Sequence, residues 1–244
     1  MKIIGIIPAR YGSSRFPGKP LVQIDGKSMI QRVYEQALKS MRLDTVIVAT
    51  DDVRIADEVS AFGGRFHLTS AAHQSGTDRC AEVIRKEPGY DVVVNIQGYE
   101  PYIDPAQIDL LVSCFDASTV QLATLVKQIH TTEELFNTNI PKVVLNGTAE
   151  AIYFSRQTIP FIRGKEKEQW LEEHVFYKHI GIYGYTAATL LEITKLEPST
   201  LELAESLEQL RWVENGYTIQ TKTTEIETIA VDTPEDLLKI AVQE

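Results

Sequence analysis

The feature that most constrains the fold is an alternation of short β-branched runs with segments of helical periodicity. Apolar runs occupy residues 2–8, 45–50, 64–68 and 91–97, and helical patterns occupy residues 28–40, 51–64, 77–86 and 104–115. Near-continuous apolar strands separated by helices are typical of a parallel sheet that is covered on both faces. We therefore expect an α/β fold of three layers, α/β/α, around a mostly parallel sheet. A length of 244 residues fits a single domain spanning residues 1–244.

One helical segment has a clear apolar face, and two others carry end signals. The segment 28–40 is expected to bury one face, formed by Met29, Ile30, Val33, Ala37 and Leu38. The segment 51–64 begins with capping aspartates and ends in glycines, and the segment 104–115 has a proline in its first turn. These signals support the helices on grounds independent of their periodicity.

The second half of the chain predicts a small antiparallel element. Residues 141–155 look like two strands around an Asn-Gly turn, and residues 177–186 form a further strand of alternating character. Helices are expected at 187–196, at 201–215 and at 233–243, the last with Thr233 as its N-cap. The charge-rich segment 163–174 is interpreted as a solvated surface segment.

Composition excludes several classes of function. A net charge of −10 argues against a general nucleic-acid binder, which needs a basic face. No apolar run approaches the roughly 20 residues of a membrane span, and the N-terminal run is too short for a signal peptide. Cys80 and Cys114 have no metal-site spacing, so we expect free thiols and a reducing, cytoplasmic location.

A cationic loop follows the first strand. Residues 8–21 (PARYGSSRFPGKPL) hold Arg10, Arg15 and Lys19 together with two glycines, in an otherwise acidic chain. Such a loop can bring backbone N–H groups and cations to a phosphate. It matches neither the Walker nor the dinucleotide-binding pattern. Composition alone leaves two interpretations open, a phosphate site or an ordinary solvated basic loop.

A second polar loop, NIQGYEP at residues 95–101, opens at the end of the strand at 91–97. The carboxyl ends of strands are where α/β proteins place their chemistry. The polar residues there are Gln97, Glu100 and Asp104, with the bulky Tyr99 between the first two.

Taken together, these motifs resemble the 3-deoxy-manno-octulosonate cytidylyltransferase (CMP-Kdo synthetase) family. The matching pieces, in the family's order, are IIPARYGSSRFPGKPL, VATDD, HQSGTDR, VVNIQG.EP, YFSR..IP, KHIGIYGY, ESLEQLRW and VDTPEDL. The resemblance implies an enzyme that couples CTP and 3-deoxy-manno-octulosonate (Kdo) into CMP-Kdo for lipopolysaccharide synthesis. It also implies a nucleotidyltransferase fold and a homodimer, with an insertion at about 140–190 for dimerisation and sugar binding.

The resemblance assigns the nucleotide site residue by residue. Arg10 and Lys19 are expected on the phosphates, where their charge stabilises the departing pyrophosphate, and they are the candidate catalytic residues. The full set expected around CTP is Ala9, Arg10, Lys19, Ser75, Gly76, Arg79 and Gln97. A simpler interpretation is that Ser75 or Thr77 caps a helix, and the two roles are compatible.

The resemblance also assigns the sugar-acid site. Arg156 is expected on the Kdo carboxylate, because arginine pairs with carboxylates through two hydrogen bonds. His179, Tyr183, Glu208 and Gln209 are expected on sugar hydroxyls. The alternatives are a satisfied core histidine at 179 and an exposed helix position at 209.

The implied reaction is attack of the anomeric hydroxyl of Kdo on the α-phosphorus of CTP, with no covalent enzyme intermediate. Positioning and charge stabilisation then carry the catalysis. Family members hold Mg²⁺ with two aspartates, which correspond here to Asp232 and to Tyr99.

Tyr99 departs from the family pattern, because a neutral phenol is a poor Mg²⁺ ligand. Glu100 cannot simply replace the missing carboxylate, since successive residues of an extended segment point to opposite sides. The sequence therefore predicts an impaired metal site. Two other functions stay open: a cytidylyltransferase for a related sugar acid such as an 8-amino Kdo, and a non-catalytic CTP-binding homologue.

Overall fold

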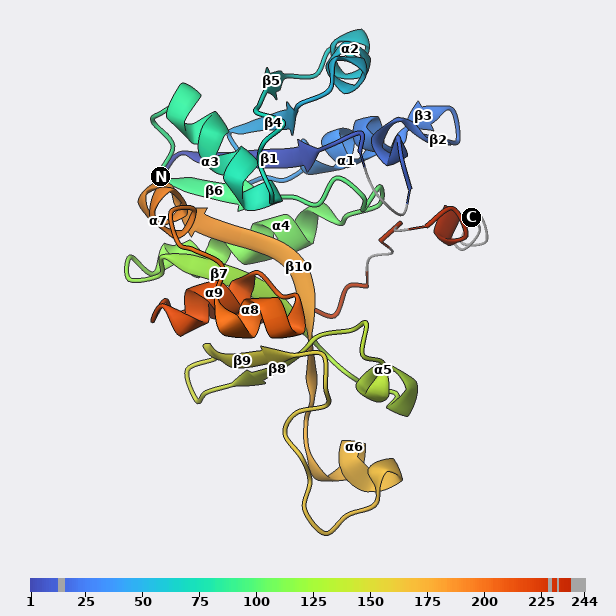
Figure 1. Cartoon of the computed structure of the whole chain (residues 1–244), viewed down its shortest axis with the longest axis vertical. Helices are drawn as coiled ribbons and strands as arrows, with labels where there is room; N and C mark the ends of the chain where they lie inside the picture. Colours follow the sequence, from blue (N-terminus) through green and yellow to red (C-terminus); the bar gives the residue numbers. More distant parts are fainter. Residues whose placement is uncertain (13–15, 228–229, 232, 238–244) are drawn as a thin grey trace.

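A single large sheet forms the centre of the molecule (Figure 1). The structure, a computed structural model, describes residues 1–12, 16–227, 230–231 and 233–237. The strand order is β11-β7-β10-β6-β1-β4-β5. The strands are β1 (Ile3–Ala9), β4 (Thr45–Thr50), β5 (Phe66–Leu68), β6 (Val92–Asn95), β7 (Leu122–Gln128), β10 (Tyr177–Thr186) and β11 (Gln220–Thr223).

Strand direction within the sheet confirms the expected mostly parallel α/β fold. β1 pairs in parallel with β4 and β6, β4 pairs in parallel with β5, and β11 pairs in parallel with β7. β10 runs antiparallel between β6 and β7. The carboxyl ends of β1, β4 and β6 therefore meet at one edge of the sheet.

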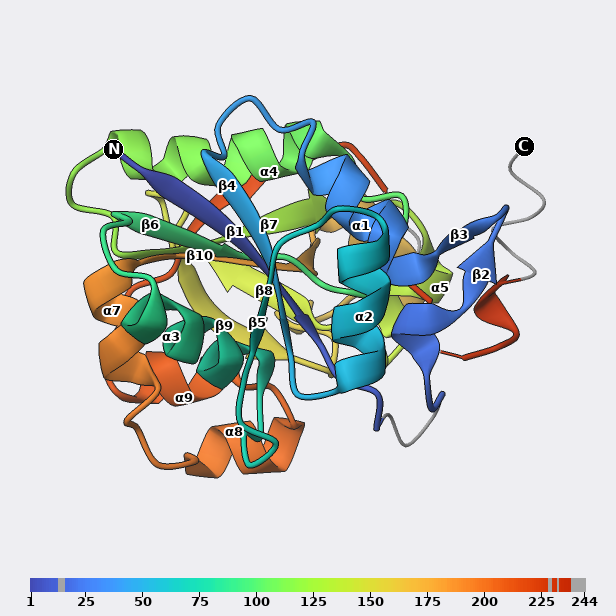
Figure 2. The same ribbon diagram turned by 90° about the horizontal axis from the view of Figure 1, so that it is seen from above.

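Helices cover both faces of the sheet, as expected for three layers (Figure 2). One face packs against α1 (Met29–Ala37), α2 (Val53–Ala61) and α4 (Pro105–Val112). The other face packs against α3 (Gly76–Lys86), α7 (Ala187–Ile193) and α9 (Gln209–Glu214). Each layer buries its own apolar cluster against the β-branched strands, which is the main stabilising contribution to such a fold.

The lower part of the molecule is a hairpin with a projecting arm, the segment 156–176 that leads from the hairpin to β10 (Figure 1). β8 (Lys142–Leu145) and β9 (Ala151–Ser155) pair antiparallel, which confirms the predicted hairpin, and β8 also pairs with β10. The remaining short elements are η1 (Lys19–Leu21), β2 (Gln23–Ile24), β3 (Lys27–Ser28), η2 (Ser113–Asp116), α5 (Thr132–Phe136), η3 (Lys167–Gln169), α6 (Trp170–Glu173) and α8 (Thr200–Glu205). Within the described residues, no helix combines the length and apolarity needed to cross a bilayer.

Two of the expectations drawn from the sequence are wrong. Leu38 is 55% exposed, because α1 ends at Ala37 and Leu38 lies about half a turn around the helix from Met29. Tyr34 lies on the buried face of α1 instead. The segment 163–174 is not solvated throughout, since Trp170 is buried among Phe136, Phe161 and Phe176.

The single helix expected at 201–215 is divided into α8 and α9. Ser206 adopts a left-handed conformation with φ of 51°, and this ends α8. Glu208 and Gln209 consequently lie at the start of α9 instead of inside a helix. The strands β7 and β11 are not predicted by the apolar-run pattern, and the helix expected at 233–243 lies mostly outside the described residues.

Candidate active site

A cavity of about 260 Å³ lies at the carboxyl edge of the sheet. The residues predicted around the nucleotide all line it: Ala9, Arg10, Lys19, Ser75, Gly76, Arg79 and Gln97. They come from the end of β1 with the cationic loop that follows it, from the start of α3 and from the loop after β6. His73, Gln74 and Gly98 also line the cavity and were not predicted from the sequence. His73 and Gln74 lie within the HQSGTDR motif, which was the available signal.

The cationic loop forms one wall of the cavity. Gly18 has a left-handed φ of 73° that favours glycine, and its N–H donates to the carbonyl of Tyr11 at 2.9 Å. The chain then turns into η1, which begins with Lys19. The Lys19 ammonium donates to the carbonyl of Val231 at 2.9 Å. Arg10 is exposed, and Arg15 lies outside the described residues.

The loop after β6 approaches the end of β1 very closely. A Cβ atom on Gly98 would lie 2.9 Å from the carbonyl oxygen of Pro8, so only glycine fits without a shift of the backbone. The neighbouring Gln97 donates through Nε2 to the carbonyl of Gly181 at 2.7 Å, which ties this loop to β10. Its side chain is therefore held at the rim of the cavity.

The amino end of α3 forms the opposite wall. Ser75 caps the helix by accepting from the N–H of Asp78 at 3.1 Å, and the Asp78 carboxylate accepts from the N–H of Ser75 at 3.2 Å. The capping interpretation of Ser75 is thereby confirmed. The first turn of this 11-residue helix also has backbone N–H groups beside the cavity that can donate hydrogen bonds to a ligand.

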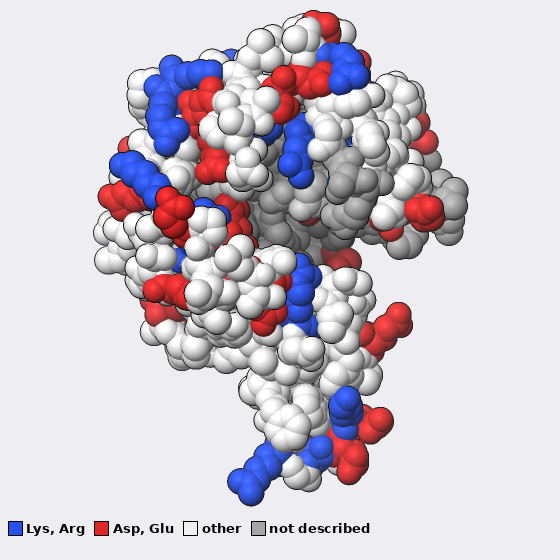
Figure 3. Space-filling model, viewed as in Figure 1, with Lys and Arg blue, Asp and Glu red and all other residues white. Residues whose placement is uncertain are grey.

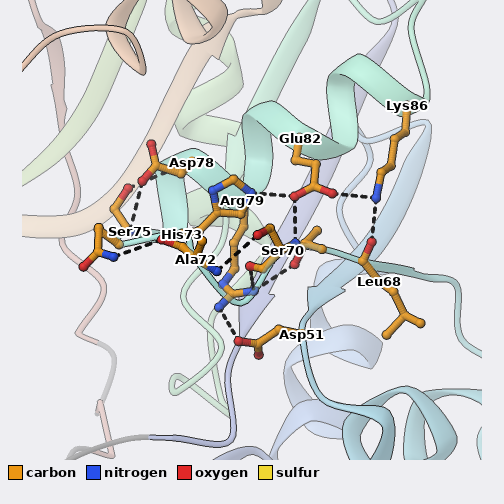
Figure 4. A network of polar contacts seen from close by, with 12 residues as sticks. Asp51, Leu68, Ser70, Ala72, His73, Ser75, Asp78, Arg79, Glu82 and Lys86 are labelled. Carbon is orange, nitrogen blue, oxygen red and sulfur yellow. Dashed lines mark hydrogen bonds and ion pairs between the residues drawn. The ribbon is translucent and has the colours of Figure 1, made fainter.

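Arg79 is held inside this wall by hydrogen bonds (Figure 4). Its guanidinium is 4% exposed and donates to Oδ2 of Asp51 at 2.8 Å and to Oγ1 of Thr69 at 2.8 Å. Its charge is therefore paired with a carboxylate at the end of β4. The geometry gives Arg79 a role in joining β4, the 69–74 loop and α3, beside any contact with the nucleotide.

Four of the predicted sugar-acid residues lie on β10 or at the start of α9, and none of them lines the nucleotide cavity itself. Oγ1 of Thr77, in the first turn of α3, donates to Oε2 of Glu208 at 2.9 Å and so joins α3 to α9. On β10, the rings of His179 and Tyr183 lie 5.1 Å apart between their centroids. Within the described part of the chain, the Tyr183 hydroxyl and Nε2 of Gln209 are buried without a hydrogen-bond partner. Buried polar atoms of this kind mark a place where a polar ligand can bind.

Burial changes the protonation of two of these residues. It raises the pKa of Glu208, and the hydrogen bond from Thr77 opposes that shift. It lowers the pKa of His179 to about 3, so the imidazole is neutral near pH 7. Nε2 of His179 lies 3.0 Å from Oγ1 of Thr124, so the ring has the hydrogen-bond partner expected of a core histidine.

Arg156 follows β9 and lies beside the break between α8 and α9. It donates to the carbonyls of Glu205, Ser206 and Thr138 at 2.7, 3.2 and 3.4 Å. Within the described chain it forms no ion pair with a carboxylate, so its charge is not neutralised there. A cation held by carbonyls alone suits an anionic ligand.

The described residues do not form a two-carboxylate magnesium site. The ring of Tyr99 lies 4.3 Å from the Lys19 ammonium, so this position already faces a cation. Glu100 is buried, at 7% exposed, and Asp232 lies outside the described residues. No group of three His, Cys, Asp or Glu side chains that could hold a metal occurs among the residues described.

The sheet order and the cationic cavity define a nucleotidyltransferase-type α/β protein. The sequence model of the cytidylyltransferase family matches residues 4–226. A 3-deoxy-manno-octulosonate cytidylyltransferase of Parabacteroides distasonis is 60% identical, over 98% of this chain and 96% of its own. One of Cytophaga hutchinsonii is 54% identical over the same shares of the two chains.

A solved structure, that of CMP:2-keto-3-deoxy-manno-octonic acid synthetase complexed with CTP, is also similar. It superposes with a TM-score of 0.92 at 43% identity, over 99% of this chain and 98% of the other. The chain thus belongs to the cytidylyltransferase family, among the 3-deoxy-manno-octulosonate cytidylyltransferases. The resemblance seen in the motifs is confirmed.

Proposed function

We propose that this chain transfers CMP from CTP to Kdo. The anomeric oxygen of Kdo bonds to the α-phosphorus, the bond from that phosphorus to the β-phosphate bridge breaks, and pyrophosphate leaves while the hydroxyl proton is released. The observation that carries this proposal is the Thr77–Glu208 hydrogen bond of 2.9 Å. It joins the wall of the cationic cavity to the helix that carries two sugar-acid candidates, and so supports the proposal that the two substrates bind side by side.

Each side of the site has a distinct task. Arg10 and Lys19 stabilise the negative charge that grows on the triphosphate as pyrophosphate departs. Arg156 binds the Kdo carboxylate, and Tyr183 and Gln209 use their unpartnered polar atoms on sugar hydroxyls. Neutral His179 orients the sugar without adding charge. These contacts align the attacking oxygen, which is the principal contribution that positioning makes to such reactions.

The proposal includes a magnesium ion with a single carboxylate ligand from the protein. Asp232 would hold it together with triphosphate oxygens, because Tyr99 supplies no carboxylate. The ion would supply charge stabilisation at the reacting phosphate.

The proposal includes a homodimer in the cytoplasm. Ile152, Phe161 and Val175 on the hairpin and arm are 53%, 73% and 46% exposed. Figure 3 shows largely uncharged surface along the arm, with charges of both signs at its tip. Apolar exposure of this kind is typical of an interface. Cys80 and Cys114 are free and buried, which fits a reducing compartment.

A substrate panel tests the reaction. Pyrophosphate release is measured with CTP, UTP or ATP, each with Kdo, with an 8-amino Kdo or with no acceptor. Release that requires CTP and Kdo supports the proposal. If release is faster with the 8-amino Kdo, that analogue is the acceptor. If the protein binds CTP but releases no pyrophosphate with any acceptor, it is a non-catalytic homologue.

The site assignments predict a division between the two substrates. Lys19→Ala should raise the KM for CTP, and Arg156→Ala should raise the KM for Kdo, each by about tenfold or more, because a charge-assisted hydrogen bond contributes about 1.5–3 kcal/mol. Lys39→Ala, an exposed lysine beyond α1, is the control. If Arg156→Ala instead weakened CTP use alone, the two sides of the site would have to be exchanged.

A further inference from the structure

Glu82 is a carboxylate on α3 that binds the loop in front of the helix. Its Oε2 lies 2.5 Å from Nε2 of His73 and accepts from the N–H of Ser70 at 2.8 Å. Its Oε1 lies 2.5 Å from the Lys86 ammonium, one turn further along the helix. Figure 4 shows these contacts radiating from the single carboxylate.

This carboxylate remains ionised over the working pH range. Burial opposes ionisation, but hydrogen bonds from Lys86, Ser70 and His73 together lower the pKa of Glu82 to about 2. A charged acceptor forms stronger hydrogen bonds than a neutral one. The loop is therefore held to α3 by a permanent negative charge.

His73 is the member of this network that lines the nucleotide cavity. The ring is partly buried, with its side chain 20% exposed, and one ring nitrogen is occupied by Glu82. A carboxylate on one nitrogen fixes the orientation of an imidazole and leaves the other nitrogen for a ligand. The same wall contains Ser75 and Gly76, and the Arg79 charge in it is paired with Asp51. This wall therefore suits the uncharged nucleoside part of the substrate.

We propose that Glu82 is a positioning residue for nucleotide binding, which sets the orientation of His73 and of the 69–74 loop against the nucleoside of the bound nucleotide. Glu82 does not itself line the cavity, so its effect passes through His73 and the loop. This inference rests on the proposed function, since the nucleotide is CTP.

The chain contains a matched control at the other end of the same helix. Glu87, the C-cap of α3, lies 2.8 Å from Nε2 of His67 through Oε2 and accepts from Arg65 at 2.7 Å through Oε1. This pair also joins the β5 region to α3, yet neither residue lines the cavity. The Glu87–His67 pair therefore has the same chemistry as the Glu82–His73 pair but lies away from the cavity.

The experiment measures CTP binding to the whole protein by titration calorimetry, without Kdo, so that turnover is not needed. Glu82→Gln keeps the length of the side chain and removes its charge, and it should raise the Kd for CTP about tenfold, the loss of roughly one charge-assisted hydrogen bond. His73→Ala should raise the Kd for CTP to a similar extent. The Kd of the double variant should not exceed the higher Kd of the two single variants, because both substitutions remove the same interaction. Glu87→Gln should leave the Kd unchanged.

The outcomes separate this inference from the function on which it rests. If the wild-type protein does not bind CTP, the proposed function fails. If the wild type binds CTP and Glu82→Gln binds equally well, or if Glu87→Gln weakens binding as much, Glu82 has no positioning role. Should Glu82→Gln fail to fold, an unchanged Kd in His73→Ala overturns the inference by itself. Thermal melts of each variant identify losses that come from stability alone.

Discussion

At the scale of single residues, Tyr99 matters most to the chemistry. It lines the cavity, its ring lies 4.3 Å from the Lys19 ammonium, and its carbonyl accepts from the N–H of Val231 at 2.9 Å. The backbone at this position therefore joins the C-terminal segment to the loop after β6, whatever the side chain. The side chain decides only whether a carboxylate faces Lys19 and the triphosphate.

Replacing Tyr99 by aspartate should therefore increase magnesium-dependent turnover. We expect Tyr99→Asp to accelerate pyrophosphate release about a hundredfold, equivalent to roughly 3 kcal/mol of transition-state stabilisation. Tyr99→Asn removes the ring without adding charge and should give a much smaller gain. Equal turnover in the wild type and in Tyr99→Asp would show that the second carboxylate is not needed.

His179 predicts a pH dependence of stability. Its pKa is about 3 in the folded protein against 6.5 in the unfolded chain, so the stability it contributes is complete above pH 6.5 and is lost as the pH falls from 6.5 towards 3. In His179→Gln, the free energy of unfolding should depend less steeply on pH across that window. The difference in slope from the wild type should correspond to the uptake of at most one proton on unfolding. Urea unfolding at several pH values measures the slope. An identical slope in the wild type and in His179→Gln would contradict the argument.

At the scale of elements, the break between α8 and α9 shapes the sugar-acid side. Ser206 at φ of 51° ends α8, and the N–H of Leu207 donates to the carbonyl of Glu202 at 3.2 Å. The chain therefore changes direction before Glu208 and Gln209, and the carbonyls of Glu205 and Ser206 accept from Arg156. One uninterrupted helix would not present these carbonyls to Arg156.

Substitutions at Ser206 should test this conformation. Ser206→Gly should stabilise the protein slightly or leave it unchanged, whereas Ser206→Val should destabilise it by about 1–2 kcal/mol, because a β-branched residue is strained in the left-handed region. Ala204→Val, on the exposed face of α8, should cost only about 0.5 kcal/mol. Chemical denaturation gives the three values, and equal losses at positions 204 and 206 would rule out the strain argument.

At the scale of the whole molecule, the sheet and the arm have separate roles. The sheet brings the ends of β1, β4 and β6 to one edge and so forms the cavity. The arm carries Phe161 and Val175, which are exposed and so add nothing to the hydrophobic core of the main body. The family resemblance implies that residues of about 140–190 serve dimerisation and sugar binding within one domain spanning residues 1–244, and this stays a prediction.

Introducing a charge on the arm should separate the proposed dimer. Phe161→Asp should shift the mass in solution from dimer to monomer, because a carboxylate in an apolar interface loses its hydration. Light scattering coupled to size exclusion measures this mass. Met41→Asp, at 89% exposed on the loop after α1, should keep the wild-type mass. A monomeric wild-type protein would remove the dimer from the proposal.

The sequence by itself determined β1, β4, β5 and β6 from apolar density, and the nucleotide residues from the motifs at their ends. Parallel strands bring their carboxyl ends to one edge, so Arg10, Ser75 and Gln97 meet there although they are far apart in the chain. Local periodicity and motif position are sufficient to predict these residues, because neither depends on how distant strands align in the sheet.

Only the tertiary structure decided how the charges pair and where the late helices break. Arg79 pairs with Asp51 because α3 packs on β4, and Glu82 pairs with His73 because α3 packs on the loop after β5. Local propensity does not encode either contact. The break at Ser206 likewise overrides a helical pattern that continues through it. The physical reason is that periodicity reports which face is buried, whereas hydrogen-bond partners depend on how separate elements are placed in space.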